Sequence, residues 1–460
     1  MHLGIWLRRR EYFMEQKHTF LKTVFRLAVP VTLQSLLQSS FGVVDQVMTG
    51  QLGSTSIAGI GLGSKFASVY TVLVSAVAAA AGIMIAQYLG KKEEEEVSRS
   101  FFVNLLVALV LAILFAALSF FFPDQIMGIY TQDPNTRAVA AGYLRIVALS
   151  FLPAAGASLF STLLRCMEAA ALPLYASVLA AVCNTGLNYV LIFGKLGFPR
   201  LGVTGAALAT VISQTIGFLL ILVLFFRYGR KQDLRLKWSL HMEKAGRLQY
   251  LGILLPILVC ELVWSLGENA YAAIYGHIGT QSCAAMTLTN PVQGLFMGVL
   301  TGISQAAGIL IGKSLGSREY DRAYQESKQL MWYGLVGALA LSALLIGVSR
   351  FYVQIYQVED VVREMACQLL FVFALFAPVK VLNMVLGGGI IRSGGRTRYL
   401  MVIDLIGTWC FGVPLGLLAA FLLELPIAWV YGMLSLEEGV RLGISFWVFR
   451  KRTWMNSLES

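Results

Sequence analysis

The sequence predicts an all-α integral membrane protein of about twelve transmembrane helices in two parallel six-helix repeats. Hydrophobic residues make up 57% of its 460 residues and charged residues only 13%, whereas a soluble domain carries roughly 25% charge. The segment AGIMIAQYLG at 81–90 also recurs as AGILIGKSLG at 307–316, an offset of 226 residues. The same offset pairs Pro30 with Pro256 and Gly50 with Gly276. The chain is therefore a tandem duplication of an apolar unit.

Apolar stretches of about 20 residues, the length that crosses a bilayer as a helix, recur along the whole chain. We expect twelve of them, centred near 36, 72, 110, 150, 183, 215, 262, 297, 338, 378, 411 and 437. The alternation typical of barrel strands is absent from the sequence. Four prolines fall inside the expected spans and are candidate kink sites: Pro30, Pro153, Pro256 and Pro378.

An even number of spans in each half makes both halves begin and end on the same side of the membrane. The halves are then parallel repeats about an axis along the membrane normal. The expected divisions are an N-terminal segment (1–23), a first lobe (24–226), a linker (227–247), a second lobe (248–449) and a tail (450–460).

Lysine and arginine gather at the start of the chain and in alternate loops, and the opposite loops at 49–56 and 276–282 are poor in both. The basic residues are Arg8, Arg9, Arg10, Lys17, Lys22, Arg26, Lys91, Lys92, Arg99, Arg227, Arg230, Lys231, Arg235, Lys237, Lys244, Arg247, Arg392, Arg396, Arg398, Arg450, Lys451 and Arg452. Because basic loops stay in the cytoplasm, we expect a multi-pass cell-membrane protein with both termini cytoplasmic. Topology thus explains the net charge of +11, and the expected partner is the lipid bilayer, with no nucleic acid. We expect a monomer.

Asp45 is the sharpest candidate for chemistry inside the membrane. It lies towards the outer end of the first span, and its spacing from Gln34 and Gln38 places all three on one helix face. We expect Gln34 and Gln38 to line the substrate-binding site. Ionisable residues in spans are costly and often functional. Such a carboxyl group can take a proton at neutral pH or stay charged and hold Na⁺. An interfacial carboxylate that caps polar neighbours is the alternative.

Asn184 and Asn188 are four residues apart in the fifth span and share one face. Beside a carboxylate, two amides can coordinate a cation or shape a proton site, although hydrogen bonding between helices would explain them as well. Thr210 in the sixth span is a further candidate for this cluster.

The second half carries a different set of polar residues, because the 226-residue offset places Tyr271 where Asp45 stands in the first half. Glu261 and Glu268 share a face of the seventh span. Lys380 and Asn383 lie in the tenth span, and Asp404 begins the eleventh. We expect Glu261 and Glu268 to couple the driving cation, and Lys380, Asn383 and Asp404 to contribute to substrate binding. Lys380 should pair with Glu261 or Glu268. A fixed structural ion pair is the alternative for Lys380, and a place near the cytoplasmic interface beside Arg398 is the alternative for Asp404.

Aromatic and methionine side chains can line a pocket for flat cationic compounds through cation–π and soft contacts. The candidates are Phe41, Trp264, Tyr271, Met297 and Trp409, for each of which packing or lipid contact is the alternative. The six cysteines and four histidines are scattered without the spacing of a zinc site or a catalytic triad. We therefore expect neither an enzyme nor a metal site, and no cofactor.

Four segments together resemble the multidrug and toxic compound extrusion (MATE) family. They are LAVPVTLQSLLQSSFGVVDQVMTGQLGSTSIAGIGL at 27–62, NYVLIFGKLGFPRLGVTGAALATVIS at 188–213, ELVWSLG at 261–267 and VLGGGIIRSGGRTR at 385–398. The resemblance covers residues 20–450. It implies two six-helix lobes that open alternately to each side, and export of cationic or amphiphilic compounds driven by inward H⁺ or Na⁺.

The resemblance also implies roles for three residues. The coupling acid of the family's first span falls on Asp45, the asparagine of its fifth span on Asn184, and a carboxylate of its seventh span on Glu261. Where some members carry a second acid in the fifth span, this chain has Asn188, which weakens an Na⁺ site built from two carboxylates. A flippase for a lipid-linked sugar or peptidoglycan precursor is the alternative function. It would favour a basic cavity for pyrophosphate, whereas the charges inside these spans are mostly acidic.

Overall fold

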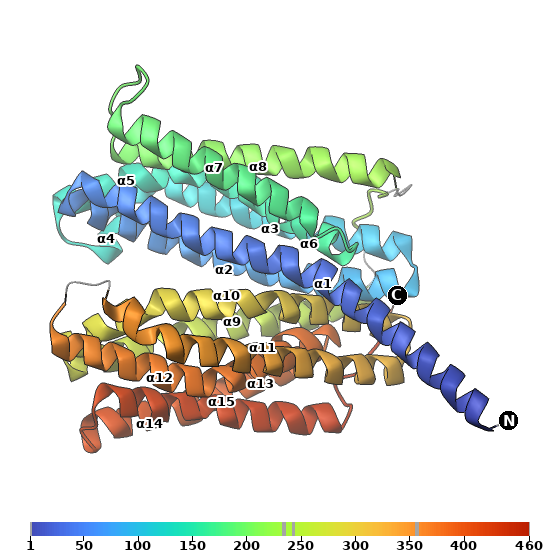
Figure 1. Ribbon diagram of the computed structural model, residues 1–460. Helices are drawn as coiled ribbons and strands as arrows, with labels where there is room; N and C mark the ends of the chain where they lie inside the picture. Colours follow the sequence, from blue (N-terminus) through green and yellow to red (C-terminus); the bar gives the residue numbers. More distant parts are fainter. Residues whose placement is uncertain (1, 232–235, 242–243, 355–357, 460) are drawn as a thin grey trace.

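Two lobes of long helices lie side by side in the computed structural model, with both chain ends at the same end of the bundle (Figure 1). The backbone is described for residues 2–231, 236–241, 244–354 and 358–459, and the side chains within these ranges from residue 19 onward except 43 and 280. The described residues contain helices and no strand, which confirms the all-α prediction. The side chains of Arg8, Arg9, Arg10 and Lys17, and residue Arg235, lie outside the described part of the chain.

The first lobe comprises α1 (His2–Thr49), η1 (Gly50–Leu52), α2 (Ser54–Lys91), α3 (Glu94–Phe121), α4 (Pro123–Tyr130), α5 (Pro134–Val147), η2 (Ala148–Ser150), α6 (Phe151–Cys166), α7 (Ala171–Phe193) and α8 (Val203–Lys231). The second lobe comprises α9 (Lys244–Ile278), α10 (Thr280–Gly316), α11 (Tyr320–Gln354), α12 (Asp360–Asn383), η3 (Met384–Ile391), α13 (Arg398–Leu405), η4 (Ile406–Gly412), α14 (Val413–Leu417), η5 (Leu418–Leu422) and α15 (Ile427–Arg450).

Eleven helical segments of the described residues are long and apolar enough to cross a membrane. The helix α15 has 24 residues, enough to cross, but carries Glu437, Glu438 and Arg441 near its middle. With α15 as the last span, the bundle has the twelve spans that the sequence predicts, six in each lobe. Their centres fall within a few residues of the predicted positions.

The prolines act differently from span to span. The fourth span is broken into α5 and α6 by the 3₁₀ turn η2, directly before Pro153. Pro30 and Pro256 lie inside the unbroken helices α1 and α9. The tenth span passes from α12, which contains Pro378, into the π-helical η3. The eleventh span is π-helical in η4 and η5, a geometry that occurs mostly as short insertions and often at functional sites.

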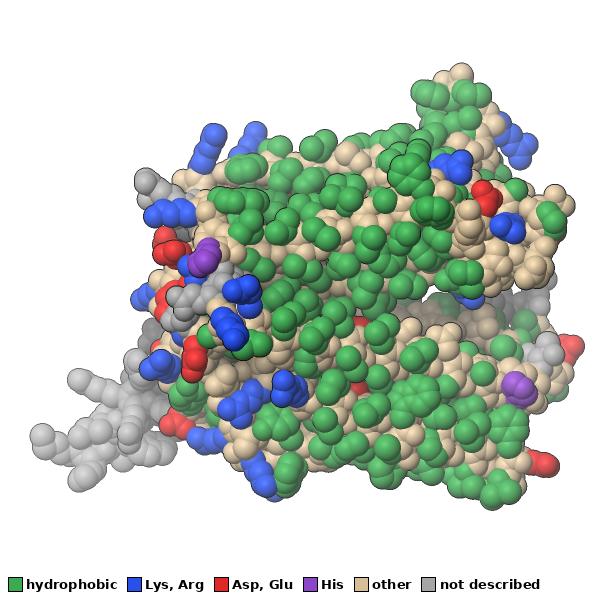
Figure 2. Space-filling view, turned by 180° about the vertical axis from the view of Figure 1, so that it is seen from behind, with side chains coloured by type: hydrophobic (Ala, Val, Ile, Leu, Met, Phe, Trp, Pro, Cys, Tyr) green, Lys and Arg blue, Asp and Glu red, His purple; other side chains and the backbone are tan. Residues whose placement is uncertain are grey.

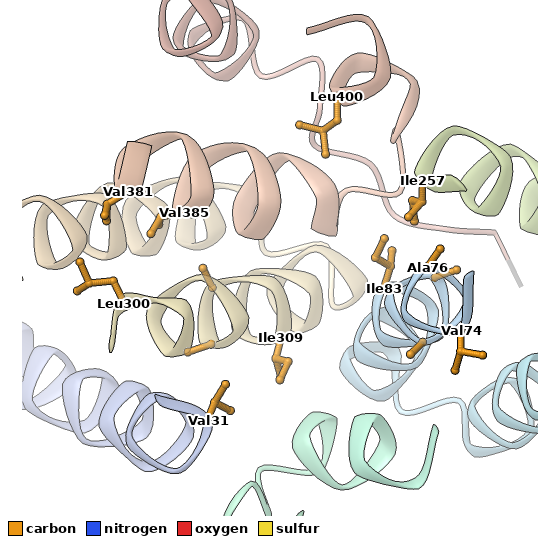
Figure 3. Close-up of a cluster of buried hydrophobic side chains, with 14 of the residues drawn as sticks. Val31, Val74, Ala76, Ile83, Ile257, Leu300, Ile309, Val381, Val385 and Leu400 are labelled. Carbon is orange, nitrogen blue, oxygen red and sulfur yellow. The ribbon is translucent and has the colours of Figure 1, made fainter. Parts of the chain in front are cut away.

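The lobes meet along α1 and α2 of the first and α9 and α10 of the second. One hydrophobic cluster runs through both lobes and includes Val31, Ile83, Ile257 and Ile309 (Figure 3). Close approach needs glycine at Gly302, where an added Cβ would lie 2.2 Å from the carbonyl oxygen of Ala28. Small residues between membrane helices allow this kind of backbone contact.

The repeated motif forms a reciprocal contact between α2 and α10. A Cβ on Gly90 would lie 2.1 Å from the carbonyl oxygen of Lys313, and a Cβ on Gly316 would lie 1.9 Å from that of Gln87. Gly90 and Gly316 are equivalent under the 226-residue offset, and so are Gln87 and Lys313. The two copies of the motif therefore touch each other through equivalent atoms.

The C-terminal segment after α15 (residues 451–459) binds to the end of the bundle at which Gly90 and Gly316 lie. The Gln87 amide donates to the carbonyl oxygens of Ser393 at 2.7 Å and Asn456 at 3.2 Å, and it accepts from the Leu458 amide at 2.8 Å. Trp454 and Leu458 are buried. Residues from both lobes and from the C-terminal segment thus close this end.

Lysine and arginine gather at this closed end, whereas the sides of the bundle are largely hydrophobic (Figure 2). The exposed basic residues there include Lys92, Arg227, Arg398 and Arg450. We call it the basic end. The chain is hollowed between the lobes towards the opposite end (Figure 2).

Candidate functional site

Asp45 lies in a chain of hydrogen bonds inside the first lobe. The Asn188 amide donates to Asp45 Oδ1 at 2.5 Å and to Asn184 Oδ1 at 3.2 Å. The Asn184 amide donates to Ser213 Oγ at 3.4 Å, and Ser213 Oγ donates to the carbonyl oxygen of Thr210 at 3.0 Å. The helices α1, α7 and α8 therefore bring together the four residues that the sequence proposed for this cluster.

Two features of this cluster suit the binding of a cation or a proton. Asp45 is half-buried and makes no ion pair with any described residue. Asn188 is fully buried, and no described residue donates a hydrogen bond to its Oδ1. A buried amide oxygen without a donor is unusual. Amide oxygen and nitrogen positions are assigned from such networks, so protonated Asp45 could donate to a rotated Asn188 amide.

A cavity of about 760 Å³ lies between the lobes and is lined by residues of both. Gln34, Gln38 and Thr210 line it, as the sequence proposed for Gln34 and Gln38. Because Thr210 also belongs to the Asp45 hydrogen-bond chain, the cavity and the carboxylate are connected through a few polar groups.

The cavity is polar. Serine and threonine hydroxyls dominate its polar lining, together with the amides of Gln34, Gln38, Gln214 and Gln305. The charged residues in its lining are Arg165 and Arg392, and no aspartate or glutamate lines it in the described part of the chain.

An ionic cluster occupies the second lobe. The Tyr271 hydroxyl donates to Glu437, and Glu437 Oε1 lies 3.9 Å from Arg441 Nη2. Arg441 also lies 3.8 Å from Asp404 Oδ1 and donates to Thr408. Asp404 thus pairs with Arg441 of α15 and not with Arg398. Three residues proposed for substrate binding, Lys380, Asn383 and Asp404, are not in the lining of the cavity between the lobes.

Lys380 faces carboxylates, but not the pair that the sequence suggested. Glu268, Glu437 and Glu438 act on it electrostatically, and its Nζ lies 5.5 Å from the ring centre of Tyr431. No carboxylate lies within 4.0 Å of this nitrogen among the described residues. The neighbouring Asn383 donates to Glu438 Oε2 at 2.7 Å.

Glu261 lies 3.7 Å from Arg392 Nη2. The prediction that Lys380 pairs with Glu261 or Glu268 is therefore wrong for Glu261. Glu268 remains near Lys380 without a close contact.

The aromatic and methionine candidates do not line the cavity between the lobes. Trp264 is 51% exposed, and Trp409 is 38% exposed while its indole donates to the carbonyl oxygen of Val263 at 3.3 Å. Phe41 is half-buried, and Met297 packs against the hydrophobic cluster. Tyr271 is buried and belongs to the ionic cluster.

Sequence reasoning missed five charged residues of these sites: Arg165, Arg392, Glu437, Glu438 and Arg441. Three charges within one predicted span were a usable signal for the last three, because charges in spans are rare. Arg392 had been interpreted as a loop residue that sets orientation.

Similarity to known protein sequences establishes the family. A sequence model of the MatE family matches residues 30–190 and again 256–418. The two matches begin at Pro30 and Pro256, the 226-residue offset of the repeat. The chain belongs to the MatE family.

Relatives match the MatE chain over most of its length. The multidrug resistance protein NorM of Burkholderia vietnamiensis is 29% identical, with 86% of each chain covered. The uncharacterized transporter YisQ of Bacillus subtilis is 24% identical over 94% of this chain and 95% of its own.

Solved structures of MATE transporters share the fold. The Vibrio cholerae MATE transporter VcmN in its bent form superposes with a TM-score of 0.86 at 17% identity, over 95% of this chain and 99% of its own. A MATE structure in complex with MaL6 has a TM-score of 0.85 at 18% identity, over 94% and 96%. The two-lobe architecture of the family is thus present here.

Proposed function

We propose that this protein is a secondary active antiporter that exports cationic or amphiphilic compounds in exchange for H⁺ or Na⁺. The observation that carries the proposal is the chain of buried and half-buried polar groups from Asp45 to Thr210, which ends at the cavity between the lobes. A cation that binds at Asp45 would change the hydrogen bonds of α1, α7 and α8, the helices on one side of that cavity. This gives a physical route from cation binding to the cargo site.

The arrangement favours H⁺ as the coupling ion. Asp45 is the one carboxylate of its hydrogen-bond chain, and its partners there are amides and hydroxyls. Protonation removes a costly charge from the span and provides a donor for the unpaired Asn188 oxygen. Na⁺ would need several oxygen ligands at once, for which Asn184, Asn188 and Thr210 are the candidates.

The proposed transport cycle is alternating access, in which the closed basic end opens and closes in turn with the opposite end. We place this end in the cytoplasm by the positive-inside rule, so that the present conformation faces outward. Opening of the contacts around Gln87, Gly90 and Gly316 would expose the cavity to the cytoplasm. The names of several relatives, including the NorM proteins, support export of drugs.

A flippase for a lipid-linked sugar or peptidoglycan precursor is the second candidate function. Arg165 and Arg392 favour it, because guanidinium groups bind phosphate oxygens well. The polar chain at Asp45 favours the antiporter, since a carboxylate next to uncharged donors is suited to reversible protonation.

Purified protein in proteoliposomes tests the proposal. Uptake of ethidium or norfloxacin is measured with a pH gradient in the absence of Na⁺, and separately with an Na⁺ gradient at matched pH. We expect the pH gradient to drive transport. Transport driven by the Na⁺ gradient alone would exclude H⁺ coupling, and no response to either gradient would exclude the antiporter.

A further inference from the structure

The charge of the inter-lobe cavity is opposite to the one expected for cationic cargo. Two arginines contribute its charged lining, one from each lobe, and no described acidic residue accompanies them there. A flat organic cation would meet hydroxyls and amides in this cavity but no carboxylate. An acidic group would meet two guanidinium groups.

Arg165 has spare capacity to bind an anion. Its Nη2 donates to the neutral Gln34 amide oxygen at 2.7 Å, and its Nε is buried with no acceptor in the described part of the chain. No carboxylate among the described residues forms an ion pair with it. Gln34 is in turn held by Ser177, to whose Oγ its amide donates at 2.7 Å. The guanidinium group is therefore positioned but not neutralised.

Arg392 is only loosely neutralised. Glu261 lies 3.7 Å from its Nη2, and its Nε is also buried, with no acceptor from any residue that the structure describes. The side chain of Arg392 keeps 22% of its surface exposed. Since Glu261 is not in the cavity lining, Arg392 can present its free side to the cavity.

The two arginines occupy corresponding places in the repeat. Arg165 lies near the end of the fourth span, and the 226-residue offset leads to Ile391, the residue before Arg392 in the tenth span. Both therefore lie near the basic end, where the lobes meet. Cys166 and Ser393, their neighbours in sequence, line the same cavity.

We propose that Arg165 and Arg392 form a subsite for the acidic group, a carboxylate or phosphate, of an amphiphilic cargo. Guanidinium groups bind such oxygens through paired hydrogen bonds. Among the described residues Arg165 has a neutral amide as its partner, and the carboxylate nearest to Arg392 lies 3.7 Å away. The inference rests on the proposed export function and specifies its cargo as carrying a negative group.

A pair of dyes that differ by one carboxyl group provides the test. Rhodamine 110 has a free carboxyl group, and rhodamine 123 is its methyl ester with the same ring system. Binding to the purified full-length protein is measured by fluorescence anisotropy, without any ion gradient. We expect tighter binding of rhodamine 110, by about tenfold or more, as for a hydrogen bond to a charged group.

Arg165→Gln and Arg392→Gln should each reduce this preference, by lowering the affinity for rhodamine 110 more than the affinity for rhodamine 123. Arg165→Lys should retain part of the preference for rhodamine 110, because lysine keeps the positive charge but lacks the paired N–H donors of a guanidinium group. Arg227→Gln, a change at an exposed arginine of α8 outside the cavity, is the matched control and should behave as wild type. Elution of each variant as a single species in size-exclusion chromatography establishes that it is folded.

Equal binding of both dyes by the wild type, or an unchanged preference in folded Arg165→Gln and Arg392→Gln, would overturn the subsite. Either result leaves the gradient experiment of the proposed function intact. Conversely, failure of gradient-driven transport with a normal dye preference would overturn the antiporter and retain the anion subsite.

Discussion

The hydroxyl of Tyr271 donates a hydrogen bond to the buried carboxylate of Glu437. Under the 226-residue offset, Tyr271 corresponds to Asp45 and Glu437 to Val211. The second lobe thus has a tyrosine at the position of Asp45, and this tyrosine binds an acid of its last span. Each lobe keeps a polar cluster, but only the second contains arginine or lysine partners within it.

Tyr271→Phe should destabilise the second lobe. The change leaves a buried carboxylate without one donor, which costs about 1–3 kcal/mol. We expect a lower melting temperature of the purified protein in detergent. Tyr275→Phe is the control, because Tyr275 is a buried tyrosine one turn away whose hydroxyl makes no hydrogen bond to a described residue. Equal melting temperatures for the two variants would contradict a stabilising role of the Tyr271–Glu437 contact.

Asp45→Asn should abolish gradient-driven export and leave insertion and folding intact. Asparagine has nearly the same shape as aspartate, but its amide cannot bind and release a proton near neutral pH. The measurement is uptake of ethidium into proteoliposomes under an imposed pH gradient. Asp124→Asn serves as the control, since Asp124 is exposed in α4 outside the spans. Wild-type transport by Asp45→Asn would move the coupling site to other residues.

The Glu261–Arg392 pair can be tested by a double-mutant cycle. Glu261→Gln and Arg392→Gln should be non-additive in unfolding free energy by about 0.5–3 kcal/mol, as for residues in contact. Glu261→Gln combined with Lys380→Met should be additive, because Arg392 and Asp404 are the charged residues that act on Glu261 and Lys380 is not among them. A larger coupling with Lys380 than with Arg392 would refute this assignment of partners.

Gly316→Ala and Gly90→Ala should loosen the basic end. In both cases the new methyl group meets a backbone carbonyl, which cannot rotate away as a side-chain tip can. We expect faster maleimide labelling of buried Cys166, which lines the cavity, in a background where the other five cysteines are serine. Gly252→Ala is the control, since no atom lies within 4 Å of its added Cβ. Unchanged labelling of Cys166 would show that these contacts do not close the cavity.

Hydropathy predicted the fold because it is a local property, and each span can be recognised from its own residues. It also located α15, although α15 carries Glu437, Glu438 and Arg441 and is not among the eleven described segments that are apolar enough to cross a membrane. The Asp45 cluster was partly predictable, since spacing placed Asn184 and Asn188 on one face. The family resemblance then supplied the association of that face with Asp45.

The ion pairs of the second lobe were not predictable from spacing. Which helices pack together determines whether Glu261 meets Lys380 or Arg392, and no local pattern contains that information. Arg392 illustrates the difficulty, because a basic residue near the end of a span fits the orientation rule equally well. Its exposure to the cavity becomes visible only when both lobes are placed side by side.

The reciprocal contact of Gly90 and Gly316 has the form of an isologous interface, in which equivalent surfaces of two identical subunits meet. In a dimer of identical half-length chains, every substitution at such an interface appears on both sides at once. Within one polypeptide each side can change alone. At the equivalent positions, Gln87 holds the neutral carbonyl group of Ser393, whereas Lys313 Nζ lies 2.6 Å from Glu168 Oε1. Salt screens an ion pair more than a neutral hydrogen bond. A rise in ionic strength should therefore weaken the Lys313–Glu168 contact and leave the Gln87–Ser393 contact nearly unchanged.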